Sequence, residues 1–195
     1  MKQVFGILLF LTLTAVVGKA QDGAFYKALF WKQMSATCRP GLRWEKSVTE
    51  FAEDGSPKTE TKVFELDCLH GSATAGETRI ALNPEEFGHL FEYMFDNPYH
   101  SENLDVQRKG ASVFAIVNAS EDSKLRLQQF EVDEATGVLR TAEANIVKDS
   151  PLYDLDVRIV VHFDEQGHYM DHLIETITDV LMGGALHTRI QARML

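Results

Sequence analysis

Apolar and polar side chains alternate strictly in the last third of the chain. Between 155 and 163 every second side chain is apolar, which is the period of a β-strand with one buried face. Similar runs occur from Ser112 onward, separated every 10–15 residues by turn sequences such as 133–137 and Gly183-Gly184. Parallel neighbours would need long crossover connections, so this spacing predicts a meander of consecutive antiparallel strands.

Two stretches in the first half of the chain predict helices. Residues 22–36 contain no proline, carry apolar side chains at helical spacing and begin with Asp22 as an N-cap. The second helix starts at Asn83-Pro84, an N-cap followed by proline at the first helical position. Its apolar stripe consists of Phe87, Leu90, Phe91, Met94 and Phe95. A stripe of this kind predicts a helix face buried on a sheet.

A hairpin is predicted between the two helices, with strands over 42–52 and 58–68 and turn residues at 53–57. The chain shows no internal repeat, low-complexity tract or linker, and about 175 residues suffice for one core. The sequence therefore predicts a single α+β domain over residues 21–195. Its expected architecture is a curved antiparallel β-meander of about eight to ten strands packed against two helices.

The register of the hairpin that follows residue 155 decides what its histidines can do. A three-residue loop over 165–167, with Gly167 in the left-handed conformation, fits the turn best. The pairs expected from this loop are Asp164–His168, His162–Met170 and Val160–His172. A four-residue loop would place His168 and His172 on the apolar face of the preceding strand, so the shorter loop is the favoured interpretation.

The same register assigns faces to the last two strands. The side chains expected on the apolar face are Tyr169, Leu173, Ile177, Leu181, Leu186, Ile190, Ala192 and Met194. Those expected on the other face are His187, Arg189, Gln191 and Arg193, with Val180–His187 and Thr178–Arg189 as the pairs beside the Gly183-Gly184 turn.

Three of the seven histidines lie within 162–172, and the predicted register puts His162, His168 and His172 on one polar face. Diagonal neighbours are ~7–8 Å apart, so these rings could converge on a zinc ion with metal–nitrogen distances near ~2.1 Å. Nothing in the sequence forces them together, and no carboxylate that would orient them can be assigned. A solvated polar face is therefore the favoured interpretation, with a zinc site as the alternative.

The first 20 residues predict a secretory signal peptide that is cleaved after Ala20. Lys2 supplies the basic start, residues 4–17 are apolar, and small residues precede the cleavage point. The apolar run is shorter than the ~20 residues of a spanning helix, so no transmembrane segment is expected after cleavage. The predicted location is secreted, either periplasmic, which the residues at the cleavage site favour, or extracellular. In a eukaryotic protein Asn118-Ala119-Ser120 would be an N-glycosylation acceptor.

Two cysteines remain in the mature chain, and Cys38 and Cys68 predict one structural disulfide in an oxidising compartment. Closing that loop stabilises the fold by about 3–4 kcal/mol in the chain-entropy model. Loss of Lys2 and Lys19 with the signal peptide lowers the formal charge from −10 to −12. An acidic chain argues against nucleic acids and anionic lipid headgroups as partners, because both bind clustered Lys and Arg.

The order of predicted elements is an N-terminal helix, strands, an inserted helix and a long meander. This order is similar to that of periplasmic lipoprotein-carrier and lipid-binding proteins. The similarity implies a carrier without a cofactor, which holds an apolar small molecule or lipid between helix and sheet. The contacts it implies are Phe87, Phe91, Met94, Phe95, Val157, Ile159 and Val161.

Two other functions stay open. The first is a structural or surface interaction protein that binds another protein and no ligand. The second is a small secreted enzyme, in which one of the three histidines or His187 meets a carboxylate inside a pocket. No nucleophile elbow, H-E-x-x-H motif, phosphate loop or dinucleotide fingerprint occurs in the sequence, which makes the enzyme the less favoured function.

Overall fold

The computed structural model describes residues 23–37, 42–67, 72–81, 104–117, 125–181 and 183–195. In chain order, the described elements are α2 (Gly23–Ala36), β1 (Arg43–Phe51), β2 (Pro57–Asp67), β3 (Ser72–Ala75), β4 (Thr78–Ala81), β5 (Leu104–Lys109), β6 (Ser112–Val117), β7 (Leu125–Asp133), β8 (Leu139–Asp149), β9 (Tyr153–Phe163), β10 (Tyr169–Val180) and β11 (Gly184–Met194). The described part of the chain is therefore mostly β. Its single helix is too short to cross a membrane.

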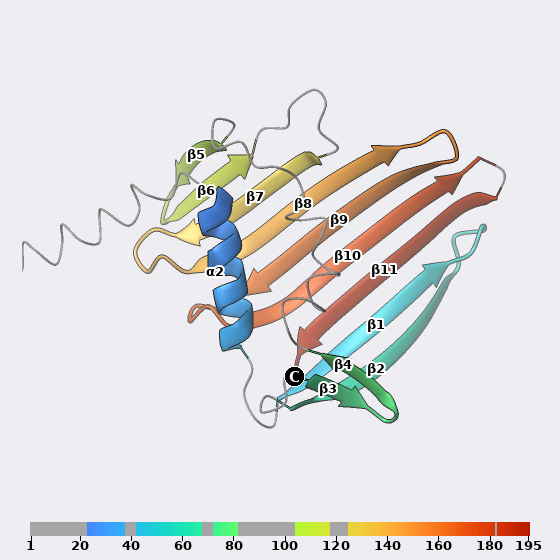
Figure 1. Cartoon of the computed structure of the whole chain (residues 1–195), viewed down its shortest axis with the longest axis horizontal. Helices are drawn as coiled ribbons and strands as arrows, with labels where there is room; N and C mark the ends of the chain where they lie inside the picture. The colour runs from blue at the N-terminus through green and yellow to red at the C-terminus, as the bar shows by residue number, and fades with distance from the viewer. Residues whose placement is uncertain (1–22, 38–41, 68–71, 82–103, 118–124, 182) are drawn as a thin grey trace, which may run out of the picture.

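All eleven described strands belong to one antiparallel sheet in the order β4-β3-β2-β1-β11-β10-β9-β8-β7-β6-β5. Every pair of neighbours except β1 and β11 is also consecutive in sequence, so the sheet is a meander joined across its middle by the β1–β11 pair. Figure 1 shows these strands side by side, with β5 and β4 toward the two edges. The predicted antiparallel meander is confirmed.

The structure differs from the prediction in strand number. Eleven strands replace the expected eight to ten, partly because β3 and β4 have only four residues each and show no readable alternation. The predicted helix from Asn83-Pro84 and the predicted Cys38–Cys68 disulfide lie outside the described residues, as do the signal peptide and Asn118.

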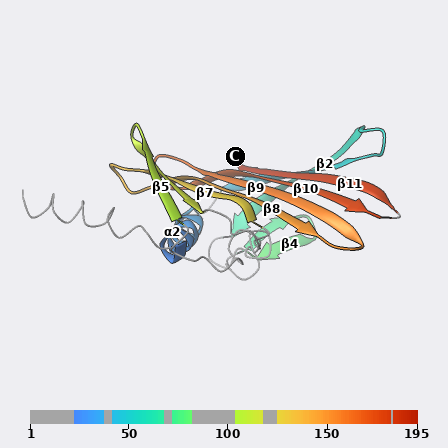
Figure 2. The ribbon, with the colours of Figure 1, turned by 90° about the horizontal axis from the view of Figure 1, so that it is seen from above.

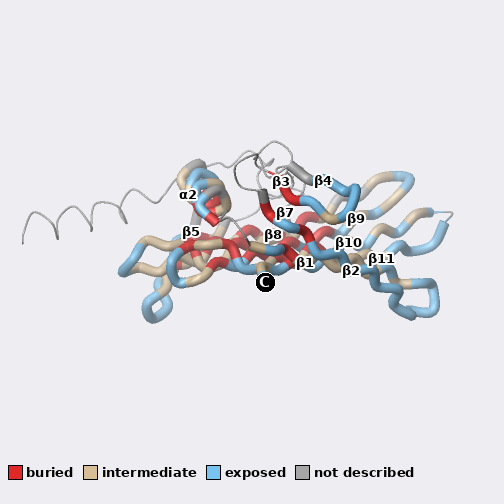
Figure 3. The backbone as a smooth tube through the Cα atoms, turned by 90° about the horizontal axis from the view of Figure 1, so that it is seen from below, coloured by how far each residue is buried: buried red, intermediate tan, exposed pale blue. Residues whose placement is uncertain are grey.

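One face of the sheet, which carries Phe130, Ile159 and Val161, packs against α2; we call it the apolar face. The face that carries Arg158 and His162 is the outer face. Figure 2 shows α2 and β4 on the same side of the sheet. In Figure 3 the buried residues, drawn red, are concentrated near the middle of the sheet and where α2 faces it. The stripe of α2 that faces the sheet has helical spacing and consists of Tyr26, Phe30 and Gln33; Thr37, directly after the helix, continues it, and all four are buried.

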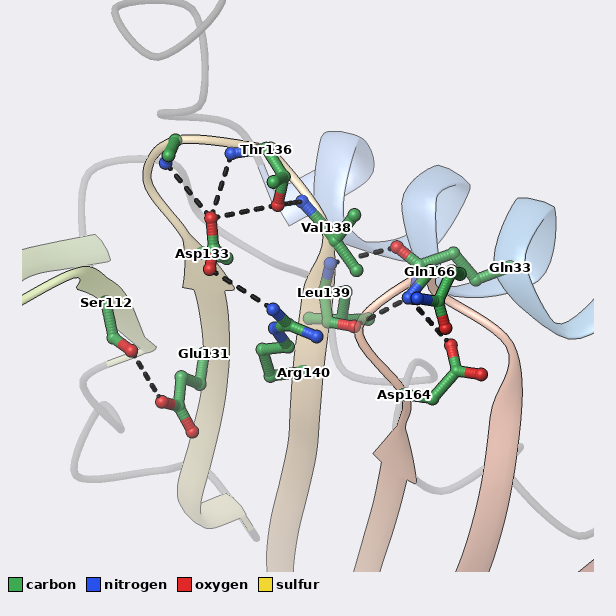
Figure 4. A network of polar contacts seen from close by, with 11 residues as sticks. Gln33, Ser112, Glu131, Asp133, Thr136, Val138, Leu139, Arg140, Asp164 and Gln166 are labelled. Carbon is green, nitrogen blue, oxygen red and sulfur yellow. Dashed lines mark hydrogen bonds and ion pairs between the residues drawn. The ribbon is translucent and has the colours of Figure 1, made fainter.

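Gln33 binds α2 to the backbone of β8. Its side-chain Nε2 donates to the Leu139 carbonyl and its Oε1 accepts from the Leu139 N–H, both at 2.9 Å (Figure 4). Pairing between β8 and β9 starts only at Thr141, so these two backbone groups have no partner strand on that side. The buried amide supplies the hydrogen bonds that a strand would otherwise make.

Thr37 performs a similar role at the start of β10. The Tyr169 N–H donates to Thr37 Oγ1 at 2.6 Å, and that hydroxyl donates to the Gln33 carbonyl at 2.9 Å. The β9–β10 register shifts between Tyr169 and Asp171, which marks a bulge at Met170. The residue that directly follows α2 thus satisfies a buried N–H at an irregularity in the sheet.

The predicted β9–β10 turn is confirmed, but the register beyond the bulge is not. Gly167 has a positive φ of 83°, and the Asp164 N–H donates to the His168 carbonyl at 2.8 Å. The pairs after the bulge are His162–Asp171, Val161–His172 and Val160–Leu173, instead of the predicted His162–Met170 and Val160–His172.

A shift of one residue moves every later side chain of β10 to the other face, because strand side chains have a period of two. Leu173 and Ile177, predicted on the apolar face, lie on the outer face, and Ile177 is 44 % exposed. His172, predicted on the polar face, lies on the apolar face and is buried.

The β10–β11 register also differs from the prediction, yet the faces of β11 are assigned correctly. Val180 pairs with Gly184 and Thr178 with Leu186, instead of with His187 and Arg189. The turn is tighter than expected, since the Gly183 N–H donates to the Val180 carbonyl at 3.0 Å. The register of β11 is shifted by three residues from the prediction, and an odd shift exchanges the two faces. It therefore cancels the exchange of faces that the bulge causes in β10. Leu186, Ile190, Ala192 and Met194 therefore remain on the apolar side.

Gly167 should be less tolerant of alanine than Gly137. Both have a positive φ, where alanine costs about 1–2 kcal/mol. A Cβ at 167 would lie 3.1 Å from Gln33 Cδ, whereas one at 137 meets nothing within 4 Å. We expect Gly137→Ala to lower the free energy of unfolding by about 1 kcal/mol and Gly167→Ala by about 2–4 kcal/mol.

Urea unfolding of the two variants measures this difference. Equal losses would show that the Gln33 amide moves aside without cost and does not hold the turn against α2.

Candidate functional site

The apolar face is buried beneath α2 through aromatic contacts. Tyr26 stacks on Phe130 with ring centroids 5.0 Å apart, and Phe30 meets Phe163 edge to face at 5.7 Å. Burial raises the pKa of the Tyr26 phenol to about 12. These contacts place α2 over β7, β8 and β9 near one end of the strands (Figure 1).

A second buried cluster lies where β1, β10 and β11 meet. Trp44 lies 5.6 Å from Phe64 and 6.0 Å from His172 between ring centroids. The Tyr169 hydroxyl is 2.8 Å from His172 Nδ1 and donates to the Ala192 carbonyl at 3.3 Å. The hydroxyl has only one proton, so both contacts are hydrogen bonds when His172 carries its proton on Nδ1.

Burial makes this cluster unsuited to proton transfer at neutral pH. It lowers the pKa of His172 from 6.5 to about 3, with a smaller contribution from the charge of Lys46. Burial also raises the pKa of the Tyr169 phenol above its usual range. Both groups therefore stay neutral between acid and strongly basic pH.

The structure separates the three histidines that the sequence placed on one face. His162 lies on the outer face, with Nδ1 2.6 Å from Asp171, and His168 Nδ1 is 3.1 Å from Asp164. His172 is buried on the apolar face. In the described residues no three histidine, cysteine or acidic side chains lie close enough to hold a metal ion. The expectation that these histidines share a face is wrong, and the physical reason is the bulge at Met170.

One histidine–carboxylate pair does border a cavity. His168 and Asp164 line a space of about 410 Å³ together with Tyr169, Asp171 and Arg193. The Asp164 carboxylate is committed to its turn, because Oδ1 accepts the backbone N–H groups of Gln166 at 2.9 Å and His168 at 2.8 Å. The pair therefore has a structural role in closing the β9–β10 turn.

The outer face carries cations that are paired with carboxylates. Arg158 binds Glu143 at 3.0 Å and Arg193 binds Glu45 at 2.8 Å. A larger group surrounds Glu175, which accepts from Arg189 and His187, while the His187 ring stacks on Phe51 at 4.1 Å. The hydrogen bond from Arg189 is the main cause that lowers the pKa of Glu175. Such pairs are typical of a solvated face.

Of the predicted ligand contacts, Val157, Ile159 and Val161 lie on the apolar face and are buried, at 4 %, 0 % and 0 % exposed. Phe87, Phe91, Met94 and Phe95 lie outside the described residues.

Two lysines that were not predicted as site residues lie on the apolar face. Lys46 pairs with Lys62 across β1 and β2 and with Ala192 across β1 and β11. Both lysines line a cavity of about 160 Å³, whose other described walls are Val48, Glu60, Phe64 and Thr78. The predicted hairpin turn at 53–57 would have placed Lys46 opposite Phe64, because 52 and 58 would be its closing pair. The observed hairpin closes at Phe51–Pro57 and therefore pairs Lys46 with Lys62.

No protein-family model matches the chain, and no curated protein sequence matches it. Among solved structures, the chain is similar to a LolA superfamily protein from Nitrosomonas europaea. The match has 6 % sequence identity and a TM-score of 0.25, and covers 85 % of this chain and 90 % of that one. An overlap this small assigns neither the fold nor the function of this chain.

His172 should make the protein less stable as the pH falls. Its pKa is about 3 when folded and 6.5 as a free side chain, so the unfolded chain binds the proton first. Its contribution to stability is fully present above pH 6.5 and is lost below that value, by about 1.4 kcal/mol per pH unit.

Urea unfolding at pH 7, 6 and 5 measures this slope. We expect His172→Phe to reduce the slope of the unfolding free energy against pH by about 1.4 kcal/mol per pH unit, which corresponds to one proton. His162→Phe, on the outer face, should leave the His172 contribution in place. An unchanged slope in His172→Phe would contradict the assigned burial of a neutral ring.

Proposed function

We propose that the chain is a secreted or periplasmic binding or carrier protein for an apolar, lipid-like ligand that lies against the apolar face. One observation carries this proposal: a continuous aliphatic row crosses the sheet, buried on β8, β9 and β10 and half-buried on β11 and β1. The proposal concerns the surface that holds the ligand and does not require an enzymatic step.

The dimensions of the sheet and the helix support it. The nine strands other than β3 and β4, spaced about 4.8 Å apart, span about 38 Å, and the central strands of 11 or 12 residues are about 37 Å long. The 14 residues of α2 cover about 21 Å by 10 Å. The other described elements over this face are β3 and β4, near the opposite edge of the sheet (Figures 1 and 3).

The aliphatic row crosses the middle strands of the sheet. Register places its members directly opposite one another on β1, β11, β10, β9 and β8, and they are Val48, Ile190, Ile174, Ile159 and Ala144. Five adjacent strands span about 19 Å, comparable to an acyl chain in one leaflet of the ~30 Å hydrocarbon core of a bilayer. The row therefore matches the length and chemistry of one hydrocarbon chain.

Exposure along the row suggests where a ligand enters. Ile159 and Ile174 are buried, whereas Ile190 and Val48 are half-buried. A hydrocarbon chain would enter from the β1 side and gain about 25 cal/mol for each Å² of apolar surface removed from water.

Two isoleucine positions on opposite faces test the proposal. Ile190 is a member of the aliphatic row, and Ile177 is exposed on the outer face of the neighbouring strand β10. We expect Ile190→Trp to weaken binding of the apolar probe N-phenyl-1-naphthylamine at least tenfold, because the larger ring occupies the row. Ile177→Trp should leave it unchanged.

Probe fluorescence gives the affinities, urea unfolding confirms that both variants fold, and native mass spectrometry before and after organic extraction detects a bound lipid. A wild-type chain that binds neither probe nor lipid, or equal affinities in both variants, would overturn the proposal.

A further inference from the structure

We infer that the ligand is an anionic amphiphile whose carboxylate or phosphate headgroup lies between Lys46 and Lys62, with its hydrocarbon chain along the aliphatic row. This inference rests on the proposed function and names the class of its ligand. Four features of the β1–β2 region carry it.

The first feature is the placement of the two ammonium groups. Lys46 and Lys62 are directly opposite each other on antiparallel strands and share the apolar face. Side chains in such a pair are about 4.5–5.5 Å apart at Cβ, and like charges placed there destabilise a sheet. An anion bound between them would convert this repulsion into two attractions.

The second feature is that Lys46 has no carboxylate partner among the described residues. Within the part of the chain that the structure describes, no carboxylate oxygen lies within 4.0 Å of its Nζ, whereas Lys62 is bound to Glu60 at 3.2 Å. Burial, and then the charge of Lys62, lower the pKa of Lys46. Both effects disfavour its ammonium, and a bound anion would oppose both.

The third feature is the contrast with the outer face. There, Arg158, Arg189 and Arg193 each bind a carboxylate, although the chain as a whole is acidic at −10. The overall charge disfavours an anionic surface as a partner. A single headgroup inside a cavity responds instead to the charges that line it, which here are two lysines and Glu60.

The fourth feature is the size and position of the cavity. Its volume of about 160 Å³ accommodates a carboxylate or phosphate with a few waters, at ~30 Å³ per water, but not a whole lipid. Val48 belongs both to the cavity wall and to the aliphatic row. A headgroup at the lysines therefore directs its hydrocarbon chain onto the row.

Competition against the apolar probe, with ligands that share one hydrocarbon chain, tests the inference. The ligands are hexadecanoate, hexadecyl phosphate, hexadecanol and hexadecylamine, each below its micellar concentration. We expect at least one of the two anions to bind tenfold or more tightly than the alcohol, and the amine to bind most weakly. The anion that binds more tightly distinguishes a fatty-acid carboxylate from a lipid phosphate.

Lysine variants locate the preference. Lys46→Met keeps the unbranched side chain and removes the charge, so the anions should bind no more tightly than the alcohol. Lys58→Met is the matched control, because Lys58 lies on the same strand and face as Lys62 but opposite Glu50. It should retain the preference for anions, and urea unfolding confirms that both variants fold.

The outcomes separate the two proposals. Equal binding of all four ligands would overturn the inference and leave the proposed function standing. A preference for anions that survives in Lys46→Met would also overturn it. Binding of none of the ligands would overturn the proposed function and the inference together.

Discussion

The hydrogen bond from the Tyr169 N–H to Thr37 Oγ1 is the interaction on which the arrangement of the sheet depends. It satisfies a buried backbone donor beside the bulge in β10. The bulge determines which side chains of β10 face α2. Without it, Leu173 would face the core and His172 would face solvent. The Gln33 amide likewise satisfies the backbone N–H and carbonyl of Leu139 at the start of β8. The helical segment thus binds the sheet at two places where strand pairing is incomplete, and it also covers aromatic side chains.

The two faces of the sheet treat charge differently, and this difference points to a site. On the outer face, arginines lie beside carboxylates and gain little from it, as exposed pairs do. On the apolar face, Lys46 lies among Trp44, Val48 and Ala192 with another lysine opposite. Water screens the charges on a solvated face, whereas a half-buried ammonium beside a second one lowers the stability of the fold. The proposed anionic headgroup would offset that cost.

The histidines show how a small change in register alters the chemistry that a sequence suggests. Spacing alone brought three imidazoles onto one face, which is the starting requirement for a zinc site. In the structure each has its own partner: Asp171 for His162, Asp164 for His168, and the Tyr169 hydroxyl for His172. Two of these pairs stabilise strand ends or turns, and the third lies in the core.

The sequence by itself determined the features that depend on neighbours along the chain. Alternation identified β9 and its apolar face, and glycines with positive φ at 137 and 167 marked the turns of an antiparallel meander. The faces of β11 were also predicted correctly, though through compensating shifts in register. Tertiary structure alone decided the bulge at Met170. The neighbouring Tyr169 N–H donates to Thr37, which is 132 residues away in sequence. Tertiary structure also decided the environment of Lys46, because the pairing of β1 with β11 places that lysine beside Ala192. Local periodicity carries no information about which distant strand will lie alongside, and the proposed site lies at such a junction.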